Sequence, residues 1–242
     1  MNYIRDSTVE TYVSAFTTEA LEQLRKKASA VCDLLIQQYG DRISERRIPP
    51  LDELVLTILS QHTNDVNMMR AFESLKKTYS TWEEVLEASQ DELGNVIKSS
   101  GMYNLKAKRI QATLREIKKR VGKLDISHLE DMDLEDAKKW LTSLHGVGPK
   151  TAAIVLLFSF GKAALPVDTH VWRVTKRLGL IEDNTSREKA HVLLEEMIPH
   201  ECIYSLNNNL VRHGREVCRA QKPRCSECIL SDICPYHNER RV

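Results

Sequence analysis

The sequence predicts an all-α fold of about ten helices. Apolar residues recur at intervals of three and four along most of the 242 residues, which is the spacing that places them on one face of a helix. No segment of useful length alternates apolar and polar residues as a half-buried strand does, and no repeat with a period of about 20 to 50 residues is present. With 42% hydrophobic and 29% charged residues, the composition is that of an ordinary globular protein.

Capping residues, glycines and prolines mark where the predicted helices begin and end. In chain order we expect helices at 21–39, 51–59, 66–77, 82–88, 91–98, 105–120, 134–144, 149–160, 167–178, 186–197 and 205–217. Gly40 ends the first helix, a basic and proline-containing link follows at 46–50, and Thr81 or Ser80 can cap the fourth helix. Pro149 suits a first helical turn, where its missing N–H has no partner to lose.

The apolar run at 151–160 has no polar face, so it should form a buried central helix. It stops within about ten residues, which is too short to span a bilayer. No secretory signal opens the sequence. A protein without membrane contact is therefore expected.

The formal net charge is only +1, but the charges are unevenly distributed. Residues 98–123 hold nine Lys or Arg against one acid, and residues 138–177 hold seven against one. Residues 124–136 hold six acids and no Lys or Arg. Such segregation can build a positive face for a polyanion on a nearly neutral protein. The solvated faces of ordinary surface helices are the alternative interpretation.

Four of the six cysteines lie close together near the C-terminus at C-x6-C-x2-C-x5-C spacing: Cys218, Cys225, Cys228 and Cys234. In a chain without a secretory signal, this clustering indicates a metal centre rather than a disulfide framework. Structural zinc commonly uses two close pairs of cysteines, and four thiolates also suit a 4Fe–4S cluster. Cys32 and Cys202 are isolated and should be small buried apolar residues.

The stretch HGVGPKTAA at 145–153 joins two predicted helices by a tight glycine turn. It is not a nucleotide phosphate loop, because Pro149 separates Gly148 from Lys150 and no strand precedes it. Two glycines let the backbone turn sharply and leave N–H groups at the start of the second helix open to a DNA phosphate. An ordinary helix–helix connection is the alternative interpretation.

Taken together, LHGVGPKTAA, the VDTH segment at 167–170 and the four clustered cysteines resemble the endonuclease III family of helix-hairpin-helix DNA glycosylases. ILSQHTND at 58–65 and GMYNLKA at 101–107 also match that family in order and spacing. The resemblance implies an N-terminal extension at 1–18, a six-helix domain at 50–163, and a second domain formed by 19–49 with 164–242. The second domain would carry a 4Fe–4S cluster held by the four clustered cysteines, and DNA would lie in the groove between the domains.

The resemblance implies a bifunctional DNA glycosylase and abasic-site lyase of base excision repair that removes damaged, in particular oxidised, pyrimidines. Lys150 would attack the sugar and form a Schiff base, from which β-elimination breaks the strand, and Asp168 would stabilise the developing positive charge. An ammonium is poorly placed in a first helical turn, whose field together with burial would favour the free amine near neutral pH. A lysine that only reaches a phosphate and an aspartate that only caps a helix are the alternatives.

An enzyme that acts on a base within a duplex must flip it out and fill the gap. By the resemblance, Met102 stands where many relatives have a leucine that enters the gap as a wedge. His62 stands where many relatives have a glutamine, and this departure concerns the contact with the base opposite the lesion. The basic loop between the first two clustered cysteines is expected to grip phosphate. The full set of expected DNA contacts is Gly146, Val147, Gly148, Thr151, His170, Gln61, His62, Met102, Tyr103, Asn104, Arg219, Lys222 and Arg224.

The expected partner is double-stranded DNA with damaged bases or abasic sites. A monomer is expected, located in the cytoplasm on the nucleoid, or in the nucleus if the source is a eukaryote. Two alternative functions remain open: a monofunctional mismatch or uracil-type glycosylase of the same fold, and a non-catalytic iron–sulfur module that binds DNA. Lys150 paired with Asp168 favours an enzyme over the second of these.

Overall fold

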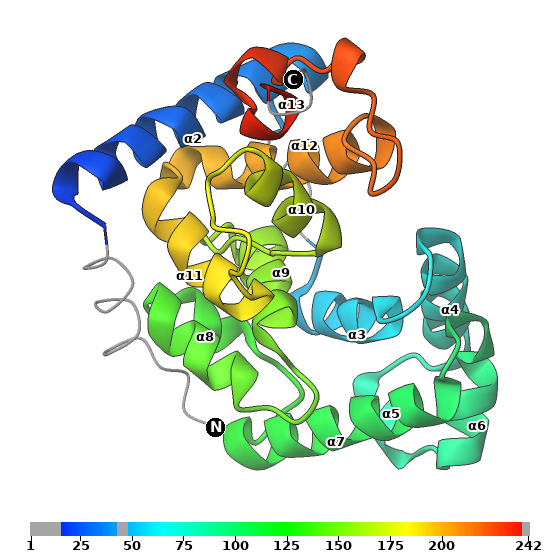
Figure 1. Ribbon diagram of the computed structural model, residues 1–242. Coiled ribbons are helices and arrows are strands. Elements are labelled where there is room, and N and C mark those ends of the chain that lie inside the picture. The colour runs from blue at the N-terminus through cyan, green and yellow to red at the C-terminus, as the bar shows by residue number, and fades with distance from the viewer. Residues whose placement is uncertain (1–15, 43–47, 239–242) are drawn as a thin grey trace. The chain divides into compact units, whose positions relative to one another are not determined.

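The computed structural model describes residues 16–42 and 48–238, and every regular element in these ranges is helical (Figure 1). The prediction of an all-α fold is therefore confirmed. Most of the expected N-terminal extension and the start of the link at 46–50 lie outside the described residues. None of the helices described combines the length and the apolar character that crossing a membrane requires.

The described α-helices are α2 (Thr18–Tyr39), α3 (Pro50–Ser60), α4 (Asp65–Thr78), α5 (Trp82–Glu87), α6 (Gln90–Val96), α7 (Tyr103–Val121), α8 (Leu134–Thr142), α9 (Pro149–Phe160), α10 (Thr169–Arg177), α11 (Arg187–Met197), α12 (Ile203–Glu216) and α13 (Pro235–Asn238). Short 3₁₀ helices are η1 (Lys98–Ser100), η2 (Ser127–Glu130), η3 (His200–Cys202), η4 (Cys225–Glu227) and η5 (Ser231–Ile233). Each predicted helix is present, with its ends shifted by at most three residues. Thr81 rather than Ser80 caps α5, because its hydroxyl accepts a hydrogen bond from the Glu84 N–H at 3.2 Å.

The chain divides into two compact units, which we describe separately. The first takes its described residues from Met1–Glu45 and Ala163–Val242, and the second from Arg46–Lys162. In the first unit, α2 packs against α11 and α12, and α12 packs against α10. Cys32 is buried in this core, as predicted, whereas Cys202 is partly exposed and corrects the expectation of burial there.

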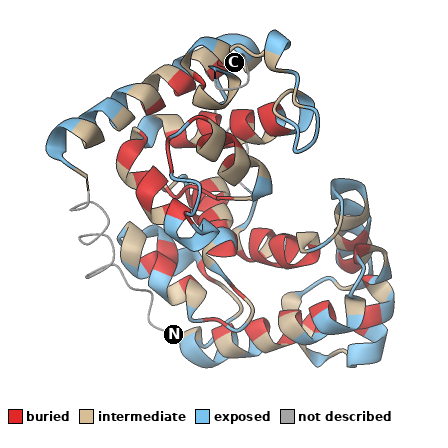
Figure 2. Ribbon diagram, in the orientation of Figure 1, coloured by how far each residue is buried: buried red, intermediate tan, exposed pale blue. Residues whose placement is uncertain are grey.

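The second unit is built around α9, which packs against α3 and α8. Its residues from Thr151 to Phe160 are buried at most positions on every side, which confirms the predicted central helix. Helix α3 is buried from Glu53 to Leu59, so it too appears almost entirely red in Figure 2. Helix α7 packs against α3, α5, α6 and η1 and so contacts most of the remaining unit.

A buried carboxyl group in α3 should make the stability of this unit depend on pH. Glu53 exposes 7% of its surface, and burial raises its pKa to about 7, while a hydrogen bond donated by Thr57 Oγ1 at 3.4 Å acts in the opposite direction. The ordinary value is 4.5. Between these two pH values the folded state binds more protons than the unfolded state, so stability falls as the pH rises.

We therefore expect Glu53→Gln to remove this loss of stability. The variant should match the wild type near pH 4 and exceed it at pH 8 by about 3 kcal/mol at most, because one pKa unit corresponds to about 1.4 kcal/mol. Urea unfolding of both proteins across this pH range measures the difference. Free energies of unfolding that change in parallel for the two proteins would contradict the expectation.

Candidate active site and metal centre

The turn between α8 and α9 has the backbone geometry that an anion site requires. Gly146 has a φ of 82°, in the left-handed region that glycine adopts without strain, and Gly148 is the extended N-cap of α9. Neither glycine N–H donates a hydrogen bond to another described residue. Backbone donors at this turn are therefore available to an anion such as a phosphate, and the dipole of α9 favours negative charge there.

Two of the expected DNA contacts in this turn have buried side chains. Val147 exposes 5% and Thr151 6% of its surface. In addition, the Val147 N–H donates to the Leu144 carbonyl at 3.2 Å. Their side chains therefore contribute to packing, and a contact of either residue with DNA is limited to the backbone.

Lys150 is the second residue of α9, and its side chain is exposed. The expected burial is thus not found, because the helix is buried only from Thr151 onward. The amine makes no hydrogen bond or ion pair with any described residue. The field of the helix N-terminus still acts on it, since the effect is largest within the first turn.

Asp168 is the N-cap of α10 in the first unit. Its Oδ1 accepts hydrogen bonds from the backbone N–H groups of His170 and Val171, each at 2.8 Å. The interpretation of Asp168 as a helix cap is therefore correct. Because both bonds go to Oδ1, the second oxygen, Oδ2, has no hydrogen bond from the described residues and remains available for chemistry.

The remaining expected DNA contact on α10 is engaged with its neighbours. His170 Nδ1 lies 3.1 Å from Arg173 Nη2, and a Cβ added at Gly214 of α12 would lie 2.8 Å from the His170 Cβ. His170 is therefore packed closely against α12, which only a glycine at 214 permits. Its role at DNA stays a prediction.

Two short turns of the second unit present the residues expected to fill the gap in DNA. His62 is exposed, and Met102 exposes 51% of its surface. Gln61 Oε1 accepts a hydrogen bond from Arg109 Nη1 at 2.7 Å. The Tyr103 ring lies 5.9 Å from the Lys98 amine, and exposed Asn104 approaches Gly94, where an added Cβ would lie 3.1 Å from the Asn104 Oδ1.

These turns also contain unusual backbone. Among the described residues other than glycine, only His62, Met102 and Lys222 have a positive φ, with values of 53°, 46° and 47°. Left-handed backbone is unfavourable for residues with a side chain, and it tends to occur where function requires it. All three residues belong to the set expected to contact DNA.

The four clustered cysteines line one small pocket together with residues of α10, η4 and η5. Burial, followed by the nearby thiols of the other three, raises the pKa of Cys228 to about 11. Burial likewise raises the pKa of Cys234. Four cysteine side chains around one pocket are a donor set that suits zinc or an iron–sulfur cluster, so the chemistry of these residues fits a metal centre. No three His, Cys, Asp or Glu side chains in the described part of the chain converge closely enough to hold a single ion.

Arg177, the last residue of α10, connects this pocket to the basic loop. Its Nη1 lies 3.3 Å from Cys218 Sγ and donates to the Arg219 carbonyl at 2.7 Å. Its own carbonyl accepts from Cys234 Sγ at 3.3 Å. Sequence reasoning missed Arg177, because its partners lie more than 40 residues away along the chain.

The basic loop itself is exposed at each of its expected phosphate contacts: Arg219, Lys222 and Arg224. Arg224 Nη1 lies 3.6 Å from Glu227 Oε2, an exposed pair of little energetic weight. The loop is thus a small, anchored positive surface next to the cysteines. This is the geometry expected of a phosphate contact.

The basic run at 98–123 does not form one uniform positive face. Lys106 exposes only 1% of its surface. Arg120 pairs with Glu116 at 2.6 Å, and Lys123 pairs with Asp125 of the acidic run at 2.7 Å. The positive surface of this unit is therefore narrower than the count of Lys and Arg suggests.

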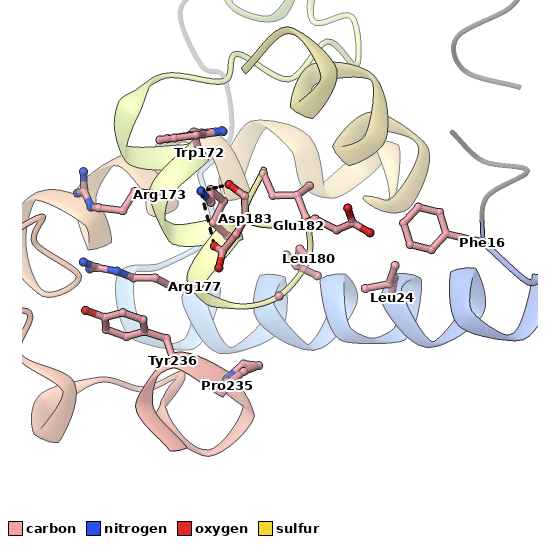
Figure 3. A pocket seen from close by; sticks show the side chains of 13 residues that line it. Phe16, Leu24, Trp172, Arg173, Arg177, Leu180, Glu182, Asp183, Pro235 and Tyr236 are labelled. Atoms are coloured by element: carbon pink, nitrogen blue, oxygen red, sulfur yellow. Dashed lines mark hydrogen bonds and ion pairs between the residues drawn. The ribbon is translucent and has the colours of Figure 1, made fainter. Parts of the chain in front are cut away.

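A larger cavity of about 550 Å³ lies in the first unit beside α10 (Figure 3). Trp172, Arg177 and Tyr236 line it, but neither Lys150 nor Asp168 does. Its cations already have partners, since Lys176 pairs with Asp183 and Arg177 lies over the Tyr236 ring at 4.4 Å. We assign no function to this cavity.

Comparisons with known proteins found matches for more than half of the chain and for the cysteine cluster. Residues 55–200 match the HhH-GPD superfamily of base excision DNA repair proteins, and residues 218–234 match the iron–sulfur binding domain of endonuclease III. Endonuclease III of Thermotoga maritima is 36% identical over 197 residues, which are 81% of this chain and 88% of that relative. Endonuclease III of Rickettsia felis is 39% identical over 185 residues, which are 76% of this chain and 82% of that relative.

A solved structure of a trapped endonuclease III–DNA covalent intermediate has a TM-score of 0.77 and is 28% identical, covering 90% of this chain and 99% of that chain. These matches confirm the resemblance carried by the glycine turn, the VDTH segment and the cysteine spacing. They also identify the metal centre as a 4Fe–4S cluster, so the zinc alternative is set aside. The chain belongs to the HhH-GPD superfamily of base excision DNA repair proteins and, within it, to the endonuclease III family.

Proposed function

We propose that the chain excises damaged, in particular oxidised, pyrimidines from double-stranded DNA through a Schiff base on Lys150. As a member of the endonuclease III family, it is a bifunctional DNA glycosylase of base excision repair that binds DNA. The observation that supports the proposed nucleophile is the exposed amine of Lys150, which has no partner among the described residues and follows directly on a glycine turn with free N–H groups. A phosphate held by that turn would bring the sugar of a flanking nucleotide close to the amine.

The proposed reaction begins when Lys150 Nζ forms a bond to C1′ of the sugar. The bond from C1′ to the base breaks, the base leaves with a proton, and opening of the sugar ring gives an iminium ion. Removal of a C2′ proton then breaks the C3′–O bond and cuts the strand. Hydrolysis of the imine releases the amine. We propose that Asp168 stabilises the positive charge that develops on the sugar and takes part in these proton transfers through its free Oδ2.

We further propose that Cys218, Cys225, Cys228 and Cys234 each bind one iron of the 4Fe–4S cluster. When bound, the cluster supplies a covalent cross-link across the loops from 218 to 234 and takes no part in base removal. Through Arg177, this cross-link holds the basic loop, which we propose binds phosphate. The two units would correspond to the six-helix domain at 50–163 and the cluster domain formed by 19–49 with 164–242, in a monomer acting on chromosomal DNA.

A panel of lesion-containing duplexes treated with borohydride tests the proposed reaction. We expect a covalent adduct and strand cleavage with oxidised pyrimidines and with a preformed abasic site, because borohydride reduces the Schiff base to a stable amine. Base release without strand cleavage or an adduct would favour the monofunctional alternative. Binding without either product would favour the non-catalytic module. Adducts only with damaged purines would contradict the proposed substrate class.

A further inference from the structure

Lys106 is a buried lysine that the proposed reaction does not use. It exposes 1% of its surface, yet it carries an ammonium group on the inner side of α7. Its Nζ donates hydrogen bonds to the Leu59 carbonyl at 2.7 Å and to the Ser100 carbonyl at 2.6 Å. Both carbonyls lie at the C-terminal ends of helices, Leu59 as the next-to-last residue of α3 and Ser100 as the last residue of η1. A cation is favourable there because these groups carry partial negative charge.

Each of these carbonyls lies two or three residues before a residue with left-handed backbone. His62, with a φ of 53°, lies three residues after Leu59, and Met102, with a φ of 46°, lies two residues after Ser100. A left-handed residue with a side chain persists only when the surrounding structure fixes it. One ammonium group therefore links the backbones that enter both turns.

Further residues on the same face of α7 continue this arrangement at helical spacing. Arg109 donates to Gln61 Oε1 at 2.7 Å, and its Cγ and Cδ would lie 3.4 Å from a Cβ added at Gly146. Thr113 Oγ1 donates to the His145 carbonyl at 3.2 Å. Helix α7 thus contacts the turn at 61–62, the turn at 101–102 and the glycine turn at 145–148 along one stripe.

We infer that Lys106 is a positioning residue for base extrusion. It holds the turns of His62 and Met102 at a fixed distance from each other, so that both side chains enter the duplex together. This inference rests on the proposed function, in which these two residues fill the gap left by the flipped nucleotide. Lys106 cannot bind phosphate itself, because its ammonium is enclosed by protein. Burial, and to a smaller extent the charge of Arg109, lowers the pKa of Lys106 to about 8, so the two carbonyls must offset the loss of water around the charge.

The test removes the ammonium and shortens the side chain by only one atom. Lys106→Met keeps most of the volume and removes both hydrogen bonds, and Lys108→Met is the matched control, because Lys108 is exposed on the same helix. Single-turnover rates are measured on three duplexes that demand different amounts of unstacking. They carry an oxidised thymine in normal sequence, the same lesion beside a mismatched base pair, and a preformed abasic site.

We expect the rate of base release from the normal duplex to be about tenfold to a hundredfold lower for Lys106→Met, because a small misplacement of the groups that enter the duplex reduces the rate steeply. The mismatched neighbour should restore much of this loss, since unstacking is easier there. Borohydride trapping on the abasic duplex should stay within about twofold of the wild type, because no base has to be unstacked there. Lys108→Met should show no difference between the three duplexes.

An equal loss on all three duplexes, or the same pattern in Lys108→Met, would overturn the inference. If Lys106→Met does not fold by circular dichroism, Lys106→Gln, which can still donate to one carbonyl, is measured on the same duplexes with the same criteria. Failure of the proposed function is distinguishable, because the wild type itself would then give no adduct on any duplex. If the wild type forms adducts and Lys106→Met loses activity equally on all three duplexes, only the role of Lys106 is rejected.

Discussion

Lys150→Ala is expected to abolish the borohydride-trapped adduct with abasic-site DNA and to leave the fold intact. The amine is the group that would form the covalent bond, so no other side chain replaces it after truncation. The fold should not suffer, because the exposed side chain makes no hydrogen bond or ion pair with the described residues. Removing a cation from the first turn of α9 is neutral or slightly stabilising, and alanine is a good helix former.

The measurement pairs adduct yield on a gel with urea unfolding. Lys119→Ala is a suitable control, since Lys119 is also exposed on a helix of the same unit and its loss changes the net charge equally. The control should trap DNA at the wild-type yield. An adduct that persists in Lys150→Ala at the wild-type yield would show that another amine is the nucleophile.

Asp168→Asn is expected to lower turnover by about a hundredfold to a thousandfold while folding and DNA affinity are retained. The asparagine oxygen can accept the same hydrogen bonds from the His170 and Val171 N–H groups, because Asn is as good an N-cap as Asp. What the variant loses is the negative charge, which the proposed reaction requires beside a positively charged sugar.

Asp168→Ala separates the two roles of this carboxylate. It removes the cap as well as the charge, so it should also lower the free energy of unfolding by about 1 kcal/mol. Single-turnover rates and urea unfolding of both variants distinguish the effects. If Asp168→Asn turns over at nearly the wild-type rate and only Asp168→Ala is impaired, Asp168 is a structural cap alone.

The helices could be predicted from the sequence because their signals are local. Apolar spacing, Gly40, Thr81 and Pro149 place the boundaries within a few residues of those observed. The burial of α9 was also predictable, since a helix with no polar face has no side to turn toward water. The same reasoning failed for Lys150, because the helix as a whole is buried but its first turn is not.

Contacts between distant segments could not be predicted in this way. In the sequence, Lys106 is one of nine basic residues in the run at 98–123, and nothing near it indicates that it turns inward. One of its acceptors lies 47 residues away. Likewise, the acidic run at 124–136 gave no sign that its carboxylates pair with lysines on either side of it, as Asp125 does with Lys123 and Glu135 with Lys138.

Helix α10 connects Asp168 to the cysteines that we propose bind iron. Its nine residues span about 13 Å as a single rigid rod. Asp168 begins that rod, and Arg177 ends it against two of the cysteines proposed to bind iron. Loss of the iron would remove the anchor at the Arg177 end of α10. We therefore expect oxidative damage to the cluster to disturb both the basic loop that Arg177 contacts and the position of Asp168 at the other end of the helix.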